Sequence, residues 1–73
     1  MDLRVESYSG RKPDERPLAF RLGDRQYRVE EILDQWYGPE ATYFRLRADD
    51  GNIYTLSHNE RDDAWDLEAF RGV

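Results

Sequence analysis

The chain has 73 residues, a net charge of −5 and 14% aromatic residues. This length supports one domain at most, so we expect residues 1–73 to form a single domain with a small core. There is no cysteine, so neither a disulfide nor a thiolate metal site can support that core. The acidic balance disfavours nonspecific binding to phosphate backbones, and the aromatic content argues against wholesale disorder.

The N-terminal sequence predicts a cytoplasmic location. The stretch MDLRVESYSG has no basic segment followed by an apolar one, so no signal peptide is visible. No run of apolar residues approaches the roughly 18 that a membrane span needs. We therefore expect a cytoplasmic protein with no membrane partner.

The first residues predict a weak strand followed by a loop. Leu3, Val5 and Ser7 alternate with their neighbours in the manner of a half-buried strand. Residues 9–17, SGRKPDERP, are polar and contain two prolines. This composition predicts a flexible loop.

The next segment predicts a β-hairpin. Apolar side chains alternate along residues 17–22, and Gly23-Asp24 follows as a two-residue turn. Glycine at the first central position suits a type II′ turn, because φ is positive there. The turn sets apolar side chains opposite one another, Phe20 opposite Tyr27 and Leu18 opposite Val29.

Residues 29–37 are ambiguous between helix and strand. The apolar side chains recur at helical spacing, at Val29, Ile32, Leu33 and Trp36. Gly38-Pro39 follows and would end a helix. A strand needs a bulge near Glu30-Glu31, because the apolar residues on either side differ in parity. The preceding hairpin and the short connection to the next strand favour a long bent strand.

The stretch YFRLRADDGNIYTLSH, residues 43–58, predicts a second hairpin. Asp49-Asp50-Gly51 fits a three-residue loop, a type I turn closed by a left-handed glycine. A two-residue Asp-Gly turn would shift the register by one and mix apolar with polar side chains. The three-residue loop keeps the two faces separate, with Leu46 opposite Tyr54, Phe44 opposite Leu56, Arg47 opposite Ile53, Arg45 opposite Thr55 and Tyr43 opposite Ser57.

The C-terminal segment predicts a polar turn and a last strand. Residues 58–63, HNERDD, are polar, and residues 64–70 place Trp65, Leu67 and Ala69 on one side. A short helix capped by the preceding aspartate is the alternative, and we favour the strand. The whole chain thus predicts an all-β fold, either a small antiparallel meander or an SH3-like or OB-like partly open barrel of five to six strands.

The sequence contains no recognisable catalytic or metal-binding constellation, so we expect no enzyme activity, no cofactor and no metal. The single histidine, His58, is expected to be exposed, and no cysteine or second histidine accompanies it for a zinc site. The serines lack a nucleophile-elbow context, and phosphate-binding glycine motifs are absent. The carboxylates of residues 60–66 lack the spacing of a calcium loop, which favours a solvated turn.

One face of the predicted sheet gathers arginines. If the two hairpins are neighbours, the side opposite the apolar residues carries Arg21, Arg28, Tyr43, Arg45 and Arg47. Arginine pairs with phosphate or carboxylate and an aromatic ring stacks on bases, so this face is the candidate binding site. Acidic residues on adjacent strands are alternative partners that would neutralise these arginines. We expect Trp36 and Trp65 in the core, because so small a domain needs its largest side chains inside.

The order of these motifs carries a resemblance. The motifs are Tyr27-x-Val29, Leu33-Asp34-x-Trp36, Tyr43-Phe44-Arg45-Leu46-Arg47, Gly51, Tyr54-x-Leu56 and Trp65-x-Leu67. Together they resemble a family of small bacterial domains of unknown function, over residues 17–68. Leu46 stands where the family pattern has valine. The resemblance implies an all-β domain and implies no catalytic or ligand-binding residue.

The sequence therefore predicts a non-enzymatic interaction module. The first hypothesis is protein–protein recognition through the arginine-bearing face, or through an exposed strand edge by strand addition. The alternative is single-stranded nucleic-acid binding through the same face, which would weaken steeply with salt. A sheet with free edges is expected to be a monomer or a weak homodimer.

Overall fold

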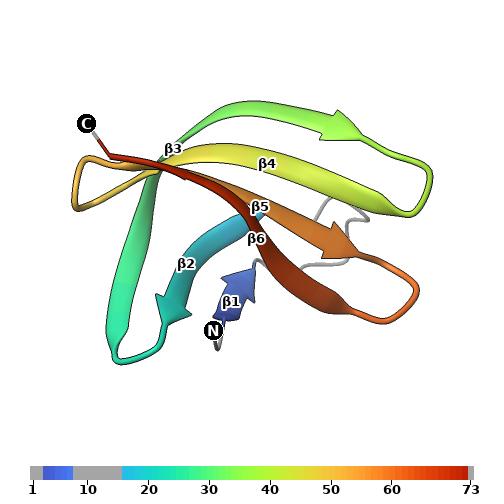
Figure 1. Cartoon of the computed structure of the whole chain (residues 1–73), viewed down its shortest axis with the longest axis horizontal. Coiled ribbons are helices and arrows are strands. Elements are labelled where there is room, and N and C mark those ends of the chain that lie inside the picture. Colours follow the sequence, from blue (N-terminus) through green and yellow to red (C-terminus); the bar gives the residue numbers. More distant parts are fainter. Residues whose placement is uncertain (1–2, 8–15, 73) are drawn as a thin grey trace.

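A computed structural model describes residues 3–7 and 16–72, and it shows six antiparallel strands curled into a half-barrel (Figure 1). The strands follow one another as a meander, in the order β1-β2-β3-β4-β5-β6. Their bounds are Leu3–Ser7 (β1), Pro17–Leu22 (β2), Arg25–Tyr37 (β3), Ala41–Ala48 (β4), Ile53–Asn59 (β5) and Ala64–Arg71 (β6). The predicted all-β meander is therefore confirmed, and the helices considered for residues 29–37 and 64–70 do not form.

The first hairpin has the predicted turn but a different pairing at its start. Gly23 has a φ of 59° and Asp24 does not have a positive φ, as a type II′ turn requires. Phe20 lies opposite Tyr27, as predicted. The predicted pairing of Leu18 with Val29 is wrong. Leu18 lies at a bulge between β1 and β2 and is 51% exposed, whereas Val29 pairs with Ala48 of β4. Of the predicted flexible loop, residues 9–15 lie outside the described residues, and its last residue instead begins β2.

The long strand β3 bends and pairs with two different strands along its length. Its first residues pair with β2, and from Val29 onward it pairs with β4 (Figure 1). A bulge lies between Val29 and Glu31, as the sequence predicted. A second bulge, between Ile32 and Asp34, was not predicted. Because a bulge adds one residue, it reverses which side chains face inward beyond it.

The concave side of the half-barrel holds the core. The buried hydrophobic residues of this core, among those described, are Phe20, Phe44, Leu46, Ala48, Tyr54 and Leu56. The ring of Tyr54 lies 4.9 Å from that of Phe20 and 5.1 Å from that of Phe70 at the end of β6. Burying each leucine or phenylalanine of this cluster contributes about 1.5–3 kcal/mol. Partly buried apolar residues such as Ile32, Trp65 and Leu67 pack around it and add to the hydrophobic stabilisation.

The second hairpin forms in the predicted register. All five predicted residue pairs are present, and the backbone N–H of Ala48 donates a hydrogen bond to the carbonyl of Asn52 across the loop (3.1 Å). Gly51 has a φ of 85°, the left-handed conformation that closes this loop. The side chain of Asp50 accepts a 2.6 Å hydrogen bond from the hydroxyl of Tyr54. The turn is thus fastened to the core by a charged hydrogen bond.

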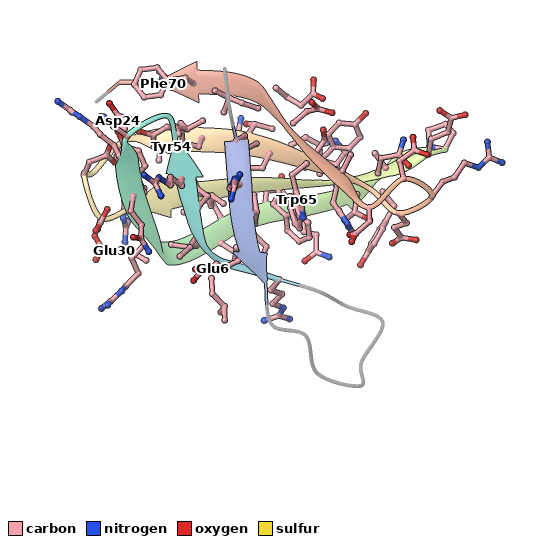
Figure 2. The ribbon with its side chains drawn as sticks, turned by 90° about the horizontal axis from the view of Figure 1, so that it is seen from below. Glu6, Asp24, Glu30, Tyr54, Trp65 and Phe70 are labelled. Atoms are coloured by element: carbon pink, nitrogen blue, oxygen red, sulfur yellow. The ribbon has the colours of Figure 1, made fainter. Side chains whose placement is uncertain are left out.

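The last strand departs from simple alternation. Trp65 and Leu67 pack against the core, as predicted. A bulge opposite Thr55 and Leu56 then places Ala69 opposite Thr55, while Phe70 lies opposite Tyr54. Ala69 is therefore on the outer side, and the prediction that it shares a face with Trp65 is wrong. Figure 2 shows Trp65 and Phe70 near opposite ends of β6.

Candidate functional site

The outer side of the sheet formed by β3 to β6, opposite the core, is the candidate site, and we call it the outer face. The strand register places its side chains in three rows that cross the sheet. The rows are Trp36, Tyr43, Ser57 and Asp66; then Leu33 with Asp34, Arg45, Thr55 and Ala69; then Glu31, Arg47, Ile53 and Arg71.

The five residues predicted to form one binding face are only partly brought together. Tyr43, Arg45 and Arg47 lie side by side on the outer side of β4. Arg28 lies at the end of this face, where its carbonyl accepts a 2.9 Å hydrogen bond from the backbone N–H of the residue after β4. Arg21 is on β2, where its Nε donates to the carbonyl of the adjacent turn glycine at 3.1 Å. Arg21 thus belongs to another part of the surface.

The two central arginines differ in their partners. Arg47 forms an ion pair with Glu31 on β3, with 3.1 Å between nitrogen and oxygen. Arg45 faces Asp34 across the same pair of strands. Oδ1 of Asp34 accepts from the backbone N–H of Gln35 at 2.8 Å instead. Within the described part of the chain Arg45 forms no ion pair, so its guanidinium is the available cation at the centre of the face.

An aromatic pair lies at one end of the outer face. Trp36 stacks on Tyr43 with 5.5 Å between the ring centroids and 7° between the ring planes. Trp36 is 40% exposed, so the prediction that it belongs to the core is wrong. The reason is the unpredicted bulge in β3, which turns Trp36 outward. Gly38 lies against this pair, since a Cβ there would be only 2.9 Å from Cε1 of Tyr43.

A shallow depression of about 340 Å³ lies on the outer face beside Arg45. Its lining residues are Leu33, Arg45, Ile53, Thr55, Ala69, Phe70 and Arg71. Leu33 is the bulged residue of β3 and is 42% exposed. The depression therefore combines an apolar lining with two guanidinium groups.

His58 is buried, at 7% exposure, which contradicts the prediction that it is a surface residue. Its ring stacks on Trp65, with the centroids 4.4 Å apart, and its Nε2 lies 2.9 Å from Oδ1 of Asp63. His58 is in phase with the buried Tyr54 and Leu56 along β5, and this period-two alternation would have revealed its position.

The neighbouring buried residue does not combine with His58 into a catalytic pair. Successive side chains of a strand point to opposite faces. Ser57 therefore points outward, and its hydroxyl donates to Oε1 of Glu68 at 2.7 Å. His58 instead contacts Asp63, whose φ of 50° lies in the left-handed region. Both contacts fasten β6 and its preceding turn to β5.

Two other hollows are more polar. One of about 470 Å³ lies between the β3–β4 and β5–β6 turns, and its lining includes Glu40, Glu60 and Asp62. Another of about 460 Å³ is lined by Arg4, Arg21, Gly23 and Asp24. In the part of the chain that the structure describes, no group of three or more histidine or carboxylate side chains is arranged to hold a metal ion. That part also contains no helix with the length and apolar character needed to cross a membrane.

Comparison with protein-family models, curated proteins and solved structures finds no match to this chain. The resemblance to small bacterial domains of unknown function stays a prediction.

Proposed function

We propose that this chain is a non-enzymatic interaction module that recognises another protein through the outer face. The observation that supports this most strongly is the exposure of Leu33 and Trp36 on a sheet face that also carries Arg45. Tryptophan, tyrosine and arginine are enriched among the residues that dominate protein–protein interfaces. A chain with so few apolar residues in its core loses stabilisation by leaving large ones outside, and binding a partner would recover it.

A strand edge adjoins the same face and offers a second set of contacts. Beyond Arg28, β3 pairs on one side only among the described strands, so residues 30–37 present a free edge (Figure 1). An extended segment of a partner can add to such an edge through backbone hydrogen bonds. Glu30, Glu31 and Asp34 lie along this edge, and repulsion between like charges on paired strands disfavours a homodimer formed there.

The test is a comparison of proteins retained by immobilised variants from an extract of the native host. Leu33→Asp and Trp36→Ala alter the outer face, whereas Leu18→Asp alters a similarly exposed leucine on β2. We expect a partner whose recovery falls about tenfold or more with both outer-face variants, which corresponds to about 1.4 kcal/mol, and is unchanged with Leu18→Asp. Equal recovery of every bound protein by all variants would contradict the proposal.

A second candidate function, single-stranded nucleic-acid binding, is favoured by one observation. The Trp36–Tyr43 stack next to Arg45 offers a ring for base stacking beside a cation for phosphate. The net charge of −5 opposes it. Titration with mixed-sequence single-stranded DNA and RNA at about 50 and about 200 mM salt separates the candidates, because phosphate binding weakens steeply over this range. Binding that is strong, salt-sensitive and lost in Arg45→Glu would favour nucleic acid.

A further inference from the structure

The depression beside Arg45 has a positively charged lining although the chain as a whole is acidic. Its lining includes the two cations Arg45 and Arg71 and no carboxylate. Both polar hollows described above have at least one carboxylate in their lining. Local positive charge without an acidic neighbour in the lining favours a ligand that carries negative charge.

The availability of these cations follows from their contacts. Arg47, the next outward arginine on β4, is held by Glu31, but Arg45 and Arg71 form no ion pair with any residue in the described ranges 3–7 and 16–72. Guanidinium groups bind carboxylates in a bidentate manner, and such pairs are stronger than neutral hydrogen bonds. A carboxylate ligand between Arg45 and Arg71 would therefore meet two guanidinium groups that have no ion-pair partner among the described residues.

The remaining lining is apolar. Leu33, Ile53 and Ala69 supply apolar side chains from the outer face, and Thr55 lies among them. Phe70 also borders the depression, although its ring packs on Tyr54. The volume of about 340 Å³ is near the lower end for small-ligand sites, and the depression is open to solvent. It fits one or two apolar side chains of an extended segment rather than a folded element.

We propose that this depression binds an acidic, apolar peptide segment of a partner protein. An apolar side chain of the segment lies on Ile53 and Ala69, while flanking carboxylates pair with Arg45 and Arg71. This inference rests on the proposed function and assigns the partner its chemistry. A polynucleotide is disfavoured, because the stacking pair Trp36 and Tyr43 is not part of the lining and the chain as a whole repels phosphates.

The test uses two short fluorescein-labelled peptides of matched length. One has a central Leu-Phe pair flanked by glutamates, and in the other lysines replace the glutamates. Fluorescence anisotropy should show that the glutamate peptide binds the wild-type chain about tenfold or more tightly than the lysine peptide. The double variant Arg45→Glu with Arg71→Glu should reverse this preference, because its depression is then acidic.

Two controls separate charge at the depression from general effects. Arg21→Glu changes the net charge as a single substitution on β2, outside the depression, and should leave the preference for the glutamate peptide unchanged. Arg45→Gln should weaken the glutamate peptide without favouring the lysine peptide. All these positions are exposed or half-exposed, and dispersed amide NMR spectra would show that each variant is folded. In the wild type, the glutamate peptide should shift the amide signals of Leu33, Thr55 and Ala69.

Three results would overturn the inference. They are no binding of the glutamate peptide at millimolar concentration, equal binding by the doubly reversed variant, and tighter Arg45-dependent binding of single-stranded DNA than of peptide. The proposed function is judged separately. Suppose that a partner protein no longer binds Leu33→Asp but still binds the double variant Arg45→Glu with Arg71→Glu. This result would support protein recognition at the outer face and would contradict the proposal that the bound segment is acidic.

Discussion

The substitution Tyr54→Phe removes one hydroxyl from the core and leaves the aromatic ring in place. The hydroxyl donates a 2.6 Å hydrogen bond to Oδ2 of Asp50 in the β4–β5 loop. The same carboxylate accepts from the backbone N–H of Asn52 at 2.9 Å and from its side-chain amide at 3.1 Å. A phenylalanine keeps the ring contacts with Phe20 and Phe70, so the variant tests the interactions of this hydroxyl alone.

The expected loss of stability follows from the exposure of Asp50. A hydrogen bond to a charged group contributes about 1.5–3 kcal/mol, most of all when the charge is buried and has no other partner. Asp50 is exposed, so water solvates its carboxylate once the hydroxyl is gone. We therefore expect a loss near or below the lower end, about 1–1.5 kcal/mol in the free energy of unfolding. In a domain of this size, that lowers the Tm by about 4–12 °C.

The loss should depend on pH. Burial acts to raise the pKa of Asp50, but hydrogen bonds from Tyr54 and Asn52 outweigh it and hold the pKa below its usual 3.8. The folded state then binds fewer protons than the unfolded state, so the stabilisation is present above about pH 4 and disappears as pH falls through the lowered pKa. Burial, followed by the bond to Asp50, raises the pKa of Tyr54 above its usual 10.0. That contribution is complete below about pH 10 and is lost as pH rises further.

Urea unfolding followed by circular dichroism, at neutral and acidic pH, measures these differences. The control is Tyr37→Phe, which removes a hydroxyl that accepts from Nε2 of Gln35 on a side chain left 69% exposed. It should change stability by less than about 0.5 kcal/mol. Two results would refute the reasoning. One is that Tyr54→Phe loses less than about 0.5 kcal/mol at neutral pH. The other is that its loss of stability at about pH 2 equals its loss at neutral pH.

Three further outcomes are expected. Leu46→Ala leaves a cavity at a fully buried site and should reduce the free energy of unfolding by about 2–5 kcal/mol. In so small a domain, a thermal melt should then start from a partly unfolded population. Arg47→Gln should change stability by less than about 0.5 kcal/mol in the same melt, because the side chains of its ion pair are 44% and 53% exposed. Gly38→Ala should displace the ring of Tyr43 from Trp36, and an unchanged near-ultraviolet circular dichroism spectrum would contradict this.

Turn chemistry and alternation were sufficient to predict both hairpins. Gly23 and Gly51 have the positive φ that their turns require, and each turn determines the register of the strands that it joins. The bulge near Glu30 was also predictable, because the apolar residues on its two sides differ in parity. Local rules work here because each hairpin joins strands that are adjacent in the sequence.

The candidate site was harder to predict because it depends on the second bulge of β3. Nothing in the sequence around Leu33 requires a bulge there, yet it turns Trp36 onto the outer face. The pairing of the arginines was likewise undetermined, since Arg45 and Arg47 both face acidic residues across the strands and only Arg47 forms an ion pair in the described sheet. By contrast, the burial of His58 follows from its parity with Leu56, so the alternation along β5 is a sufficient signal for it.

Site-specific photocrosslinking in the native host tests most directly the claim that the outer face binds another protein. A benzoylphenylalanine placed at Leu33 reports on the outer face, and one placed at Leu18, which is similarly exposed on β2, serves as the reference. The account predicts a discrete adduct with another polypeptide from position 33 and none from position 18. No adduct from position 33, or the same adducts from both positions, would contradict it.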